Sequence, residues 1–581
     1  MEGTEQEMGP RLWISELSFS DGSSLQLKSD DIIVIVGPNN SGKSEALRGI
    51  NQKLSNLLTP NPVILELKSE RQGEPSSLED WLMAHTHFVD DPVTNPQYQG
   101  HGVTVHKNQA VELWSNPQNG FQALTPFFCK LLNAEGRLAA VNPANNIALG
   151  KDAPNHPIHY LQLDDDLEQR ISEQFKKAFD QDLVVHHKAG SIVPLHVGTR
   201  PVLPLTKDRA SKEYAKMLRL LPELQRQGDG MRSFAGVLLH TTVGHESIFL
   251  LDEPEAFLHP PQARLLGRML VEDKQANRQL FIATHSGDVL KGILDSGSKN
   301  VRVVRLRREG NVNIMRQLDN DKITELWGDP LLRYSDILDG LFHEKVIITE
   351  GDSDARFYAA LMNSQAEANT GKRKYPSVMF THCGGKGRLP LVAGSLNAVD
   401  VPVIVVPDFD VLNDESTLSK LVASLGGEWN EMVTAWKQVK VAIESKKPET
   451  SGTEIKAQIE EALKAATEPV FPASTAKAIK AILKTSSPWS TAKAIGKQFI
   501  PGGQPTQQYD ELQAMLEAIG IFIVPLGELE SFCKKCGGHG PSWVNEVLKL
   551  PLVSDPDLQS ARDFVGKLAD WRKTVKVTTD N

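Results

Sequence analysis

Cysteine is scarce in this chain, with only four residues among 581: Cys129, Cys383, Cys533 and Cys536. So few thiols in so long a chain argue against a disulfide-built scaffold and fit a reducing compartment. Long apolar runs are also missing. The longest ones, such as residues 32–36 and 401–406, have the length of strands, well short of the roughly 20 residues that cross a bilayer. We therefore expect no membrane-spanning segment and no membrane partner.

The first ten residues lack the basic and apolar regions of a secretory signal, so we expect a cytoplasmic location. A basic excess is missing too, because the net charge is −10. This charge argues against a generally basic nucleic-acid coat, but not against a local basic patch or a carboxylate metal site. With 40% hydrophobic and 23% charged residues, the composition is that of a soluble globular protein, and the length predicts two to four domains.

Residues 37–44 form a complete G-x-x-x-x-G-K-S motif between an apolar strand and a predicted helix. Its glycines let the backbone N–H groups curl around a phosphate, and the helix start adds positive potential. Lys43 can then reach the β- and γ-phosphates, while Ser44 offers its hydroxyl to Mg²⁺. The motif predicts an ATP site formed by Gly37, Asn39, Asn40, Ser41, Gly42, Lys43 and Ser44.

A second motif, at residues 247–255, is an apolar strand that ends in acids. Asp252 can hold Mg²⁺ through water, and Glu253 can polarise the attacking water. A third strand, residues 279–284, delivers His285 to a position where it can sense the γ-phosphate. Taken alone, a histidine such as His285 is more often structural, so its predicted catalytic role depends on the two other motifs.

Together these motifs resemble the ABC-type ATPase heads of the SMC and RecF group. Residues 252–262 are similar to that group's Walker B motif and D-loop, and residues 283–286 to its switch histidine. Residues 228–233 occupy the place of the signature helix, although they depart from L-S-G-G-Q. The resemblance implies that two protomers sandwich ATP, as a homodimer or higher homo-oligomer formed through the heads.

The interval between the two nucleotide motifs shows no sustained heptads, which argues against a coiled-coil arm. It contains a polar, Pro/Asn-rich stretch (residues 59–120) and an amphipathic segment (residues 161–179). We expect a compact insertion or dimerisation subdomain at about residues 59–190. Arg200, just beyond it, could either touch nucleotide or cap a strand.

The second half of the chain has a different set of acids at strand ends. A predicted strand at residues 345–349 ends in Glu350, with Asp354 at the start of a helix, and another at 401–407 ends in Asp408 and Asp410. Because residues two apart in a strand share a face, Asp408 and Asp410 can point the same way. Such carboxylates would hold Mg²⁺ or Mn²⁺ for phosphoryl chemistry. The alternative is a set of ordinary surface acids.

This order of acids resembles a Toprim domain. Glu350 matches the Toprim glutamate, Asp408 and Asp410 match its acidic pair, and the E-G-x-x-D form that includes Asp354 resembles the nuclease branch. In that branch a late acid after another strand adds a metal ligand. Glu530 is our candidate for this acid, with Glu528 left open.

An ATPase head followed by a Toprim domain resembles the OLD family of ATP-dependent endonucleases, which includes the Gabija nuclease and OLD-type retron effectors. The resemblance implies an α/β protein with an ATPase domain at residues 1–335 and a Toprim nuclease domain at 341–581. A helical insertion is expected at about residues 415–505. The family implies DNA as substrate and often a role in antiphage defence, with nucleotide either activating or restraining cleavage.

Within the expected helical insertion, the hexapeptide S-T-A-K-A-I occurs twice, at residues 474–479 and 490–495. The lysines of the two copies could form a basic face for a phosphate backbone. Solvated lysines, a gate or a partner-docking surface remain as alternatives.

Two further motifs stay open. Cys533 and Cys536 form a single C-x-x-C, followed by a histidine, but structural zinc normally takes four protein ligands. Alternatively, Lys534 or Lys535 could stabilise charge at the scissile phosphate. The glycine-rich residues 382–387 could let a substrate approach closely or form a simple turn.

The sequence thus predicts an ATP-binding, Mg²⁺- or Mn²⁺-dependent endonuclease that cuts DNA under nucleotide control. Glu253, His285, Glu350, Asp408 and Asp410 are its predicted catalytic residues. One alternative is an ATP-driven sensor or scaffold whose Toprim module regulates a partner effector. Another is a variant that cuts RNA or tRNA. A defence-system protein or nucleic acid is a further possible partner.

Overall fold

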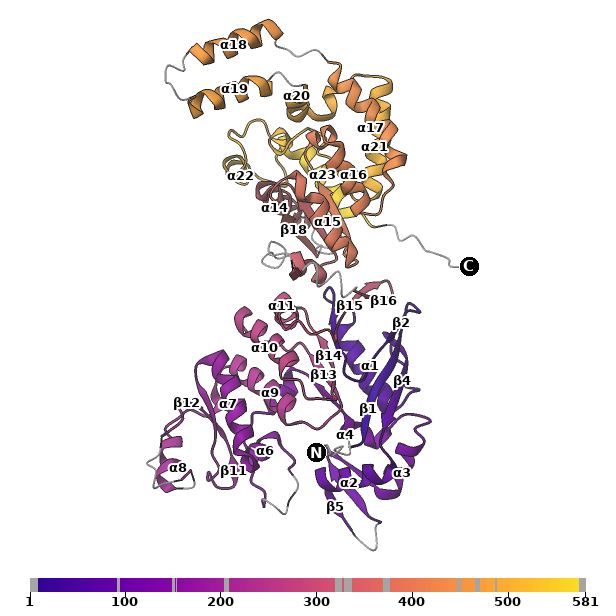
Figure 1. Ribbon diagram of the computed structural model, residues 1–581, viewed down its shortest axis with the longest axis vertical. Helices are drawn as coiled ribbons and strands as arrows, with labels where there is room; N and C mark the ends of the chain where they lie inside the picture. Colours follow the sequence, from indigo (N-terminus) through magenta and orange to yellow (C-terminus); the bar gives the residue numbers. More distant parts are fainter. Residues whose placement is uncertain are drawn as a thin grey trace, which may run out of the picture. The chain divides into compact units, whose positions relative to one another are not determined.

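The protein is described here by a computed structural model (Figure 1). The structure describes residues 9–573 except 91–94, 149–151, 153, 203–207, 210, 319–326, 329–336, 369–376, 447–450, 465–470 and 486–487. The chain divides into two compact units, Met1–Tyr334 and Ser335–Asn581. No helix within the described ranges is long and apolar enough to cross a bilayer.

The first unit is built on a six-stranded sheet in the order β16-β15-β3-β14-β13-β8. All neighbours pair in parallel except β16, which is antiparallel to β15. The central strand β3 is buried along its whole length, as expected for a parallel strand covered on both faces. The strands span Ile32–Val36 (β3), Cys129–Leu132 (β8), Ile248–Asp252 (β13), Gln279–Ala283 (β14), Val301–Glu309 (β15) and Val312–Gln317 (β16).

Helix α1 (Lys43–Ser55) packs between this sheet and a second, antiparallel sheet, β2-β1-β4. The strands of the second sheet are β1 (Arg11–Phe19), β2 (Ser24–Gln26) and β4 (Ile64–Gln72). One hydrophobic cluster joins residues of both sheets, α1 and the segment that leads to β8.

Residues 59–190 do not form one separate insertion. Strand β4 belongs to the antiparallel sheet of the head, and β8 is the edge strand of the central sheet. Two smaller parts of the segment lie outside these sheets: the β5-β6-β7 sheet, and helices α6 and α7, which pack near β10 and α9. The proposed dimerisation role of this region stays a prediction.

The remaining elements of the first unit surround the two sheets (Figure 1). They are α2 (Pro75–His85), β5 (His87–Val89), β6 (Gln97–Gly100), β7 (Val103–His106), α3 (Lys107–Ser115), α4 (Thr125–Phe128), α5 (Ala134–Ala139), β9 (Ala144–Asn145), α6 (Pro157–Leu163), α7 (Asp165–Phe179), β10 (Asp182–Val185), β11 (Ile192–Val193), β12 (Leu195–Gly198), α8 (Lys212–Leu218), α9 (Asp229–Val243), α10 (Pro260–Glu272) and α11 (Gly287–Asp295).

The second unit is built on a parallel sheet in the order β18-β17-β19, with β17 at Lys345–Thr349, β18 at Val378–His382 and β19 at Val403–Val406. An extended segment, residues 520–524, runs beside β19. Val405 N donates to Gly520 O at 2.8 Å, and Phe522 N donates to Val405 O at 2.8 Å. The order and direction of these elements confirm the predicted α/β fold class for this half of the chain.

Helices cover the parallel sheet of the second unit, and further helices follow β19, where the helical insertion was expected. A hydrophobic cluster packs α14 (Asp352–Ala368), α22 (Pro541–Val547) and α23 (Gln559–Asp570) against the sheet. Figure 1 shows α18 and α19 as a hairpin at the outer end of this unit. The other helices are α15 (Leu389–Ala398), α16 (Glu415–Ser424), α17 (Trp429–Glu444), α18 (Gly452–Lys464), α19 (Ala473–Thr485), α20 (Pro488–Ile495) and α21 (Gln504–Ala518).

Candidate functional site

The phosphate-binding motif connects β3 with α1, and two of its positions require glycine. Gly37 and Gly42 have φ values of 146° and 94°, in the region that side chains rarely adopt. A Cβ on Gly37 would lie 2.1 Å from Leu306 O, and one on Gly42 would lie 2.6 Å from Asn313 Nδ2. The loop is therefore held against β15 and β16.

The last two residues of the nucleotide motif, Lys43 and Ser44, have defined hydrogen-bond partners. Lys43 Nζ donates to the carbonyl oxygens of Gly37 and Pro38, at 2.9 and 3.0 Å. Ser44 Oγ donates to Asp252 Oδ1 at 2.8 Å, so the two side chains predicted to share Mg²⁺ already touch. Burial lowers the pKa of Lys43 and raises that of Asp252.

The middle of the loop differs from residue to residue. Asn39 and Asn40 are exposed, whereas Ser41 is buried and its carbonyl accepts a 2.6 Å hydrogen bond from Asn313 Nδ2. Contacts of these three residues with a phosphate stay predictions.

The side chains of the predicted Walker B glutamate, Glu253, and of the predicted switch histidine, His285, lie side by side. His285 Nδ1 is 3.4 Å from Glu253 Oε1 and 3.2 Å from Glu255 Oε1. Glu255 is buried, and it accepts hydrogen bonds from Thr284 Oγ1 at 2.8 Å and from the backbone of His285 at 2.9 Å. The sequence analysis gave Glu255 no role, yet this carboxylate fixes the backbone of the predicted sensor.

Arg137 is a second residue that the sequence analysis missed. Its guanidinium is fully buried and donates to the carbonyls of Asp252 and Glu253, at 2.7 and 2.8 Å, and to Ser233 Oγ at 3.0 Å. It therefore ties the Walker B backbone to α9. No local sequence motif around residue 137 predicts this contact.

The segment in the place of the signature helix starts α9. A Cβ on Gly230 would lie 2.8 Å from Phe257 O, so α9 begins in close contact with the segment after Walker B. The predicted contact of residues 228–233 with ATP bound by a second protomer is untested by a single chain and stays a prediction.

In the second unit, acids from two strand ends meet. Glu350 follows β17 and Asp408 and Asp410 follow β19, and one oxygen from each lies within 4.8 Å of the other two. The backbone N–H of Asp408 also donates to Glu350 Oε1 at 3.0 Å. Parallel pairing of β17 with β19 brings these residues together, because both strands end at the same edge of the sheet.

The acids raise one another's proton affinity. Burial, and then the charge of Asp408, raises the pKa of Glu350 to about 7 and that of Asp354 to about 7. Asp354 lies beside the three-acid group, where Oδ2 accepts a hydrogen bond from Gly351 N at 3.1 Å. These carboxyls are the type of site that a nearby cation would stabilise in the charged form.

Neither candidate for the late acid joins the three-acid group among the described residues. Glu530 Oε1 instead accepts from Gly540 N and contacts His539 Nδ1, each at 2.7 Å. Burial is the main cause that raises the pKa of Asp408, and the charge of Glu530 adds to it. Burial also raises the pKa of Glu528. Glu530 as a metal ligand stays a prediction.

Two lysines, to which the sequence analysis gave no role at the acids, reach the same carboxylates. Lys493 Nζ lies 2.7 Å from Asp408 Oδ2 and 3.5 Å from Asp410 Oδ1, and Lys386 Nζ lies 2.8 Å from Asp410 Oδ2. Lys535, which was considered for this place, instead pairs with Asp555 at 2.7 Å.

Two family models match this chain, one in each unit. Residues 149–290 match a model described as "AAA domain, putative AbiEii toxin, Type IV TA system". Residues 341–410 match a model described as "Overcoming lysogenization defect protein-like, TOPRIM domain". The matched stretch of the chain ends at Asp410.

Curated relatives agree with the second model. The Old nuclease of Escherichia phage P2 is 25% identical over 174 residues, which is 29% of this chain and 28% of that protein. The OLD nuclease of Thermus scotoductus is 28% identical over 174 residues, 28% of this chain and 30% of that protein. The second unit thus matches an OLD-like Toprim domain, and parts of the chain are similar to OLD nucleases.

The OLD-family match covers less than a third of the length of either nuclease. Another relative, the uncharacterized protein MJECL11 of Methanocaldococcus jannaschii, is 30% identical over 99 residues, 16% of this chain and 87% of that protein. Among solved structures, an SmcHead bound to the C-winged helix domain of ScpA has a TM-score of 0.33 at 13% identity, covering 54% of this chain and 99% of that one. An SMC head domain from Thermotoga maritima has a TM-score of 0.28 at 11% identity, with 54% and 100% covered.

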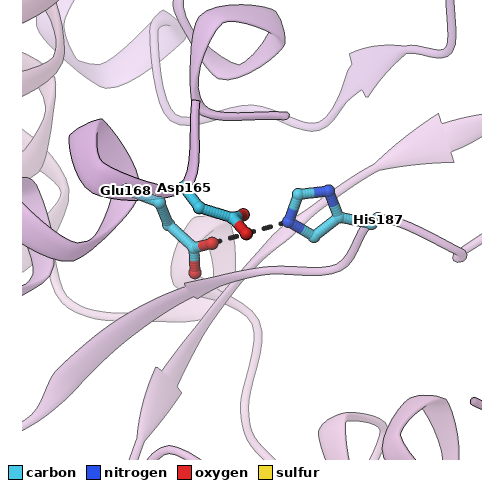
Figure 2. Close-up of side chains that lie close together, drawn as sticks. All are labelled: Asp165, Glu168 and His187. Carbon is cyan, nitrogen blue, oxygen red and sulfur yellow. Dashed lines mark hydrogen bonds and ion pairs between the residues drawn. The ribbon is translucent and has the colours of Figure 1, made fainter. Parts of the chain in front are cut away.

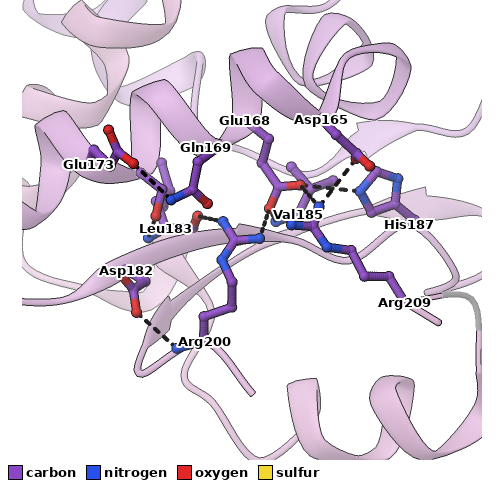
Figure 3. A network of polar contacts seen from close by, with 11 residues as sticks. Asp165, Glu168, Gln169, Glu173, Asp182, Leu183, Val185, His187, Arg200 and Arg209 are labelled. Carbon is purple, nitrogen blue, oxygen red and sulfur yellow. Dashed lines mark hydrogen bonds and ion pairs between the residues drawn. The ribbon is translucent and has the colours of Figure 1, made fainter. Parts of the chain in front are cut away.

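The chain has a second group of possible metal ligands, Asp165, Glu168 and His187 (Figure 2). Two arginines already occupy it (Figure 3): Arg200 Nη1 lies 2.9 Å from Glu168 Oε1, and Arg209 Nη1 lies 3.1 Å from Glu168 Oε2. In this arrangement the group is a partly buried ion-pair network, with Glu168 buried and Asp165 exposed. Arg200 thus pairs with an acid, and its backbone N–H donates to Asp182 Oδ2 at 2.9 Å beside β12.

The two cysteines of the C-x-x-C motif form a thiol pair. The two Sγ atoms of Cys533 and Cys536 lie 3.4 Å apart. Within the described ranges they belong to no group with the geometry of a metal site, and His539 contacts Glu530 instead. The structure therefore gives the zinc interpretation no support.

A cavity of about 880 Å³ in the first unit is rich in histidine. It lies at the amino ends of β8 and β13, the opposite edge of the sheet from the phosphate-binding loop. Burial lowers the pKa of three lining histidines: His156 to about 4, His240 to about 3 and His245 to about 4. The cavity is separate from the nucleotide motifs.

Proposed function

We propose that this protein is an ATP-binding, metal-dependent endonuclease that cuts DNA under nucleotide control. The convergence of Glu350, Asp408 and Asp410 at one sheet edge is the observation that carries the proposal. The match to an OLD-like Toprim domain and the similarity to OLD nucleases support it. A cytoplasmic location and a role in bacterial antiphage defence are part of the proposal by family resemblance.

The three-acid group fits a divalent cation. Oxygens within 4.8 Å of one another can share an ion that binds each at about 2.0–2.6 Å. Buried acids whose pKa values are raised by mutual repulsion are stabilised by such an ion. Glu350, Asp408 and Asp410 would hold Mg²⁺ or Mn²⁺, with Asp354 and Glu530 beside them. When bound, the ion would polarise a phosphodiester and lower the pKa of an attacking water.

The nucleotide half of the proposal rests on the contacts of the first unit. Lys43 can turn from its carbonyl partners to the phosphates of ATP, and the Ser44–Asp252 pair can hold Mg²⁺. Glu253 would polarise the attacking water, and His285 lies beside its carboxylate. ATP held between two heads would make dimerisation part of the control.

The test is cleavage of supercoiled plasmid by the full chain across a matrix of Mg²⁺, Mn²⁺ and nucleotide. Glu350→Gln and Asp408→Asn should lower the cleavage rate at least about 100-fold, because each removes an anionic ligand of the metal. Glu415→Gln, at an exposed acid on α16, is the control and should cut normally. Wild-type rates in both acid variants would refute the nuclease site.

A separate arm tests the nucleotide site. Lys43→Ala should weaken ATP binding by at least about tenfold, since it removes the cation that faces the β- and γ-phosphates. Equilibrium binding of a fluorescent ATP analogue measures this independently of cleavage. If Lys43→Ala binds the ATP analogue with unchanged affinity, the proposed ATP site is refuted, whatever the cleavage assay shows.

The same matrix separates the alternatives. Duplex DNA, single-stranded DNA and tRNA are offered in parallel, so preferential cutting of tRNA would favour the RNA-cleaving variant. ATP binding without cleavage of any substrate would favour a sensor or scaffold that acts through a partner effector.

A further inference from the structure

The second copy of the repeated hexapeptide places a positive charge inside the acid site. Lys493, on α20, lies 2.7 Å from Asp408 Oδ2 and 3.5 Å from Asp410 Oδ1. Its side chain is 32% exposed, so the pair is partly shielded from water. The ammonium group therefore stands between the two carboxylates that the family pattern assigns to a metal.

The backbone that carries this lysine is fixed to the site. A Cβ on Gly527 would lie 2.0 Å from Lys493 O, and one on Gly496 would lie 2.2 Å from Pro525 O. Ser531 Oγ also donates to Ala494 O at 3.0 Å. Because α20 is held against the loop that leads to the late acids, only the flexible side chain of Lys493 can leave the carboxylates.

An ammonium group and a divalent ion cannot share this position. Mg²⁺ binds carboxylate oxygens at about 2.0–2.1 Å, and the Lys493 nitrogen, 2.7 Å from Asp408 Oδ2, already takes up one of the positions from which a cation can contact that oxygen. Two cations at such short range also repel each other strongly in a partly buried site. Binding of one must therefore weaken binding of the other.

We propose that Lys493 is a resident counter-ion of the metal site, which holds Asp408 and Asp410 in the metal-free protein and is displaced by a divalent ion that binds there. The inference rests on the proposed metal-dependent function. Lys493 thus lowers the affinity for metal, and in return it relieves the repulsion between acids when metal is absent. It is a positioning residue for the carboxylates.

The chain supplies its own control. The first copy of the hexapeptide places Lys477 at the equivalent position of α19, where the side chain is exposed. Lys477→Met and Lys493→Met therefore make the same chemical change in the same local sequence. Only the second removes a charge from the acid group.

The first experiment measures Mn²⁺ affinity of the full-length variants by titration calorimetry, without any substrate. Lys493→Met should bind Mn²⁺ about tenfold more tightly than wild type, and Lys477→Met should be unchanged. Metal-free Lys493→Met should also melt at a lower temperature, and saturating Mn²⁺ should restore it, since the ion replaces the lost charge.

The outcomes separate the inference from the function on which it rests. Equal Mn²⁺ affinity of wild type and Lys493→Met would contradict the displacement of Lys493 by the metal ion. It would leave the proposed metal site itself intact. Absence of Mn²⁺ binding by both proteins would remove the proposed metal site itself.

A second measurement needs no variant at Lys493. In the wild-type protein, an acetylating reagent should label Lys493 faster when Mn²⁺ is present, because the released amine becomes accessible, and Lys477 should label at one rate throughout. Mass spectrometry of the peptides gives both rates. Labelling of Lys493 that does not change at saturating Mn²⁺ would overturn the proposal even if Lys493→Met fails to fold.

Discussion

At the scale of single residues, Arg137 connects two parts of the nucleotide site. Three of its donors reach Ser233 on α9 and the carbonyls of Asp252 and Glu253. Glu253 has φ of 47°, a strained conformation for a residue with a side chain. Bonds from a planar, buried guanidinium help to keep the glutamate backbone in that conformation. Arg137 is thus placed to transmit the position of α9 to the Walker B motif.

Arg137→Lys should therefore slow ATP hydrolysis more than it weakens ATP binding. Lysine keeps the charge but cannot reproduce the forked donors, so we expect kcat to fall about 10- to 100-fold while KM changes less than about threefold. Steady-state phosphate release measures both constants. Arg268→Lys, at a half-exposed arginine on α10, is the control.

Ser233→Ala gives a milder test of the same contact, because it deletes one acceptor and leaves the guanidinium in place. A KM that rises in proportion to any loss of kcat in both variants would contradict a positioning role for Arg137.

At the scale of elements, α20 depends on two glycines that lack room for a side chain. Gly496 and Gly527 have φ values of 70° and 104°. Both lie against backbone atoms, which cannot move aside as a flexible side chain can. This close approach places Lys493 at the acids. The position of the proposed counter-ion therefore depends on the backbone conformation at Gly496 and Gly527.

Gly527→Ala should destabilise the second unit by about 2–4 kcal/mol, through backbone strain and the clash with Lys493 O. Thermal unfolding and hydrogen exchange over residues 488–532 measure the loss. Gly452→Ala, at the start of α18, meets no atom within 4 Å and should leave the stability unchanged or slightly higher. If hydrogen exchange over residues 488–532 is unchanged in Gly527→Ala, the loop can accommodate the added methyl group, which would contradict this prediction.

At the scale of the whole molecule, the two units carry buried groups that respond to pH in opposite directions. In the first unit, His156, His240 and His245 have lowered pKa values, so the unfolded chain binds more protons between about pH 4 and 6.5. Their contribution to stability is lost as the pH falls through that range. In the second unit, Glu350 and Asp354 have pKa values raised to about 7, and their contribution falls as the pH rises from about 4.5 to 7.

Calorimetry of the metal-free protein should therefore show the melting of the first unit moving several degrees lower between pH 7.5 and pH 5.5, while that of the second unit moves up or stays constant. Saturating ATP identifies the transition of the first unit, because a ligand stabilises the part that binds it. His240→Gln should reduce the pH sensitivity of this transition. A parallel downward shift of both transitions would contradict the assignment of the buried groups.

The sequence by itself determined the features that a short stretch of chain can encode. The G-x-x-x-x-G-K-S loop, the acids that end the Walker B strand, and Glu350 with Asp408 and Asp410 were recognisable because strand, turn and functional residue are neighbours along the chain. These motifs were sufficient for the resemblance to the OLD family, and that resemblance implied an α/β protein.

The tertiary structure alone decided which distant residues meet these motifs. Arg137 lies over a hundred positions before Asp252, and Lys493 lies 85 positions after Asp408. The hexapeptide itself does not distinguish Lys493 from Lys477, since both lie at the same position of it. Packing of long-range elements selects one of them, and it also assigns β4 and β8 to the head and Arg200 to an ion pair. Such contacts depend on how the whole chain folds, because no local backbone preference specifies a partner so far away.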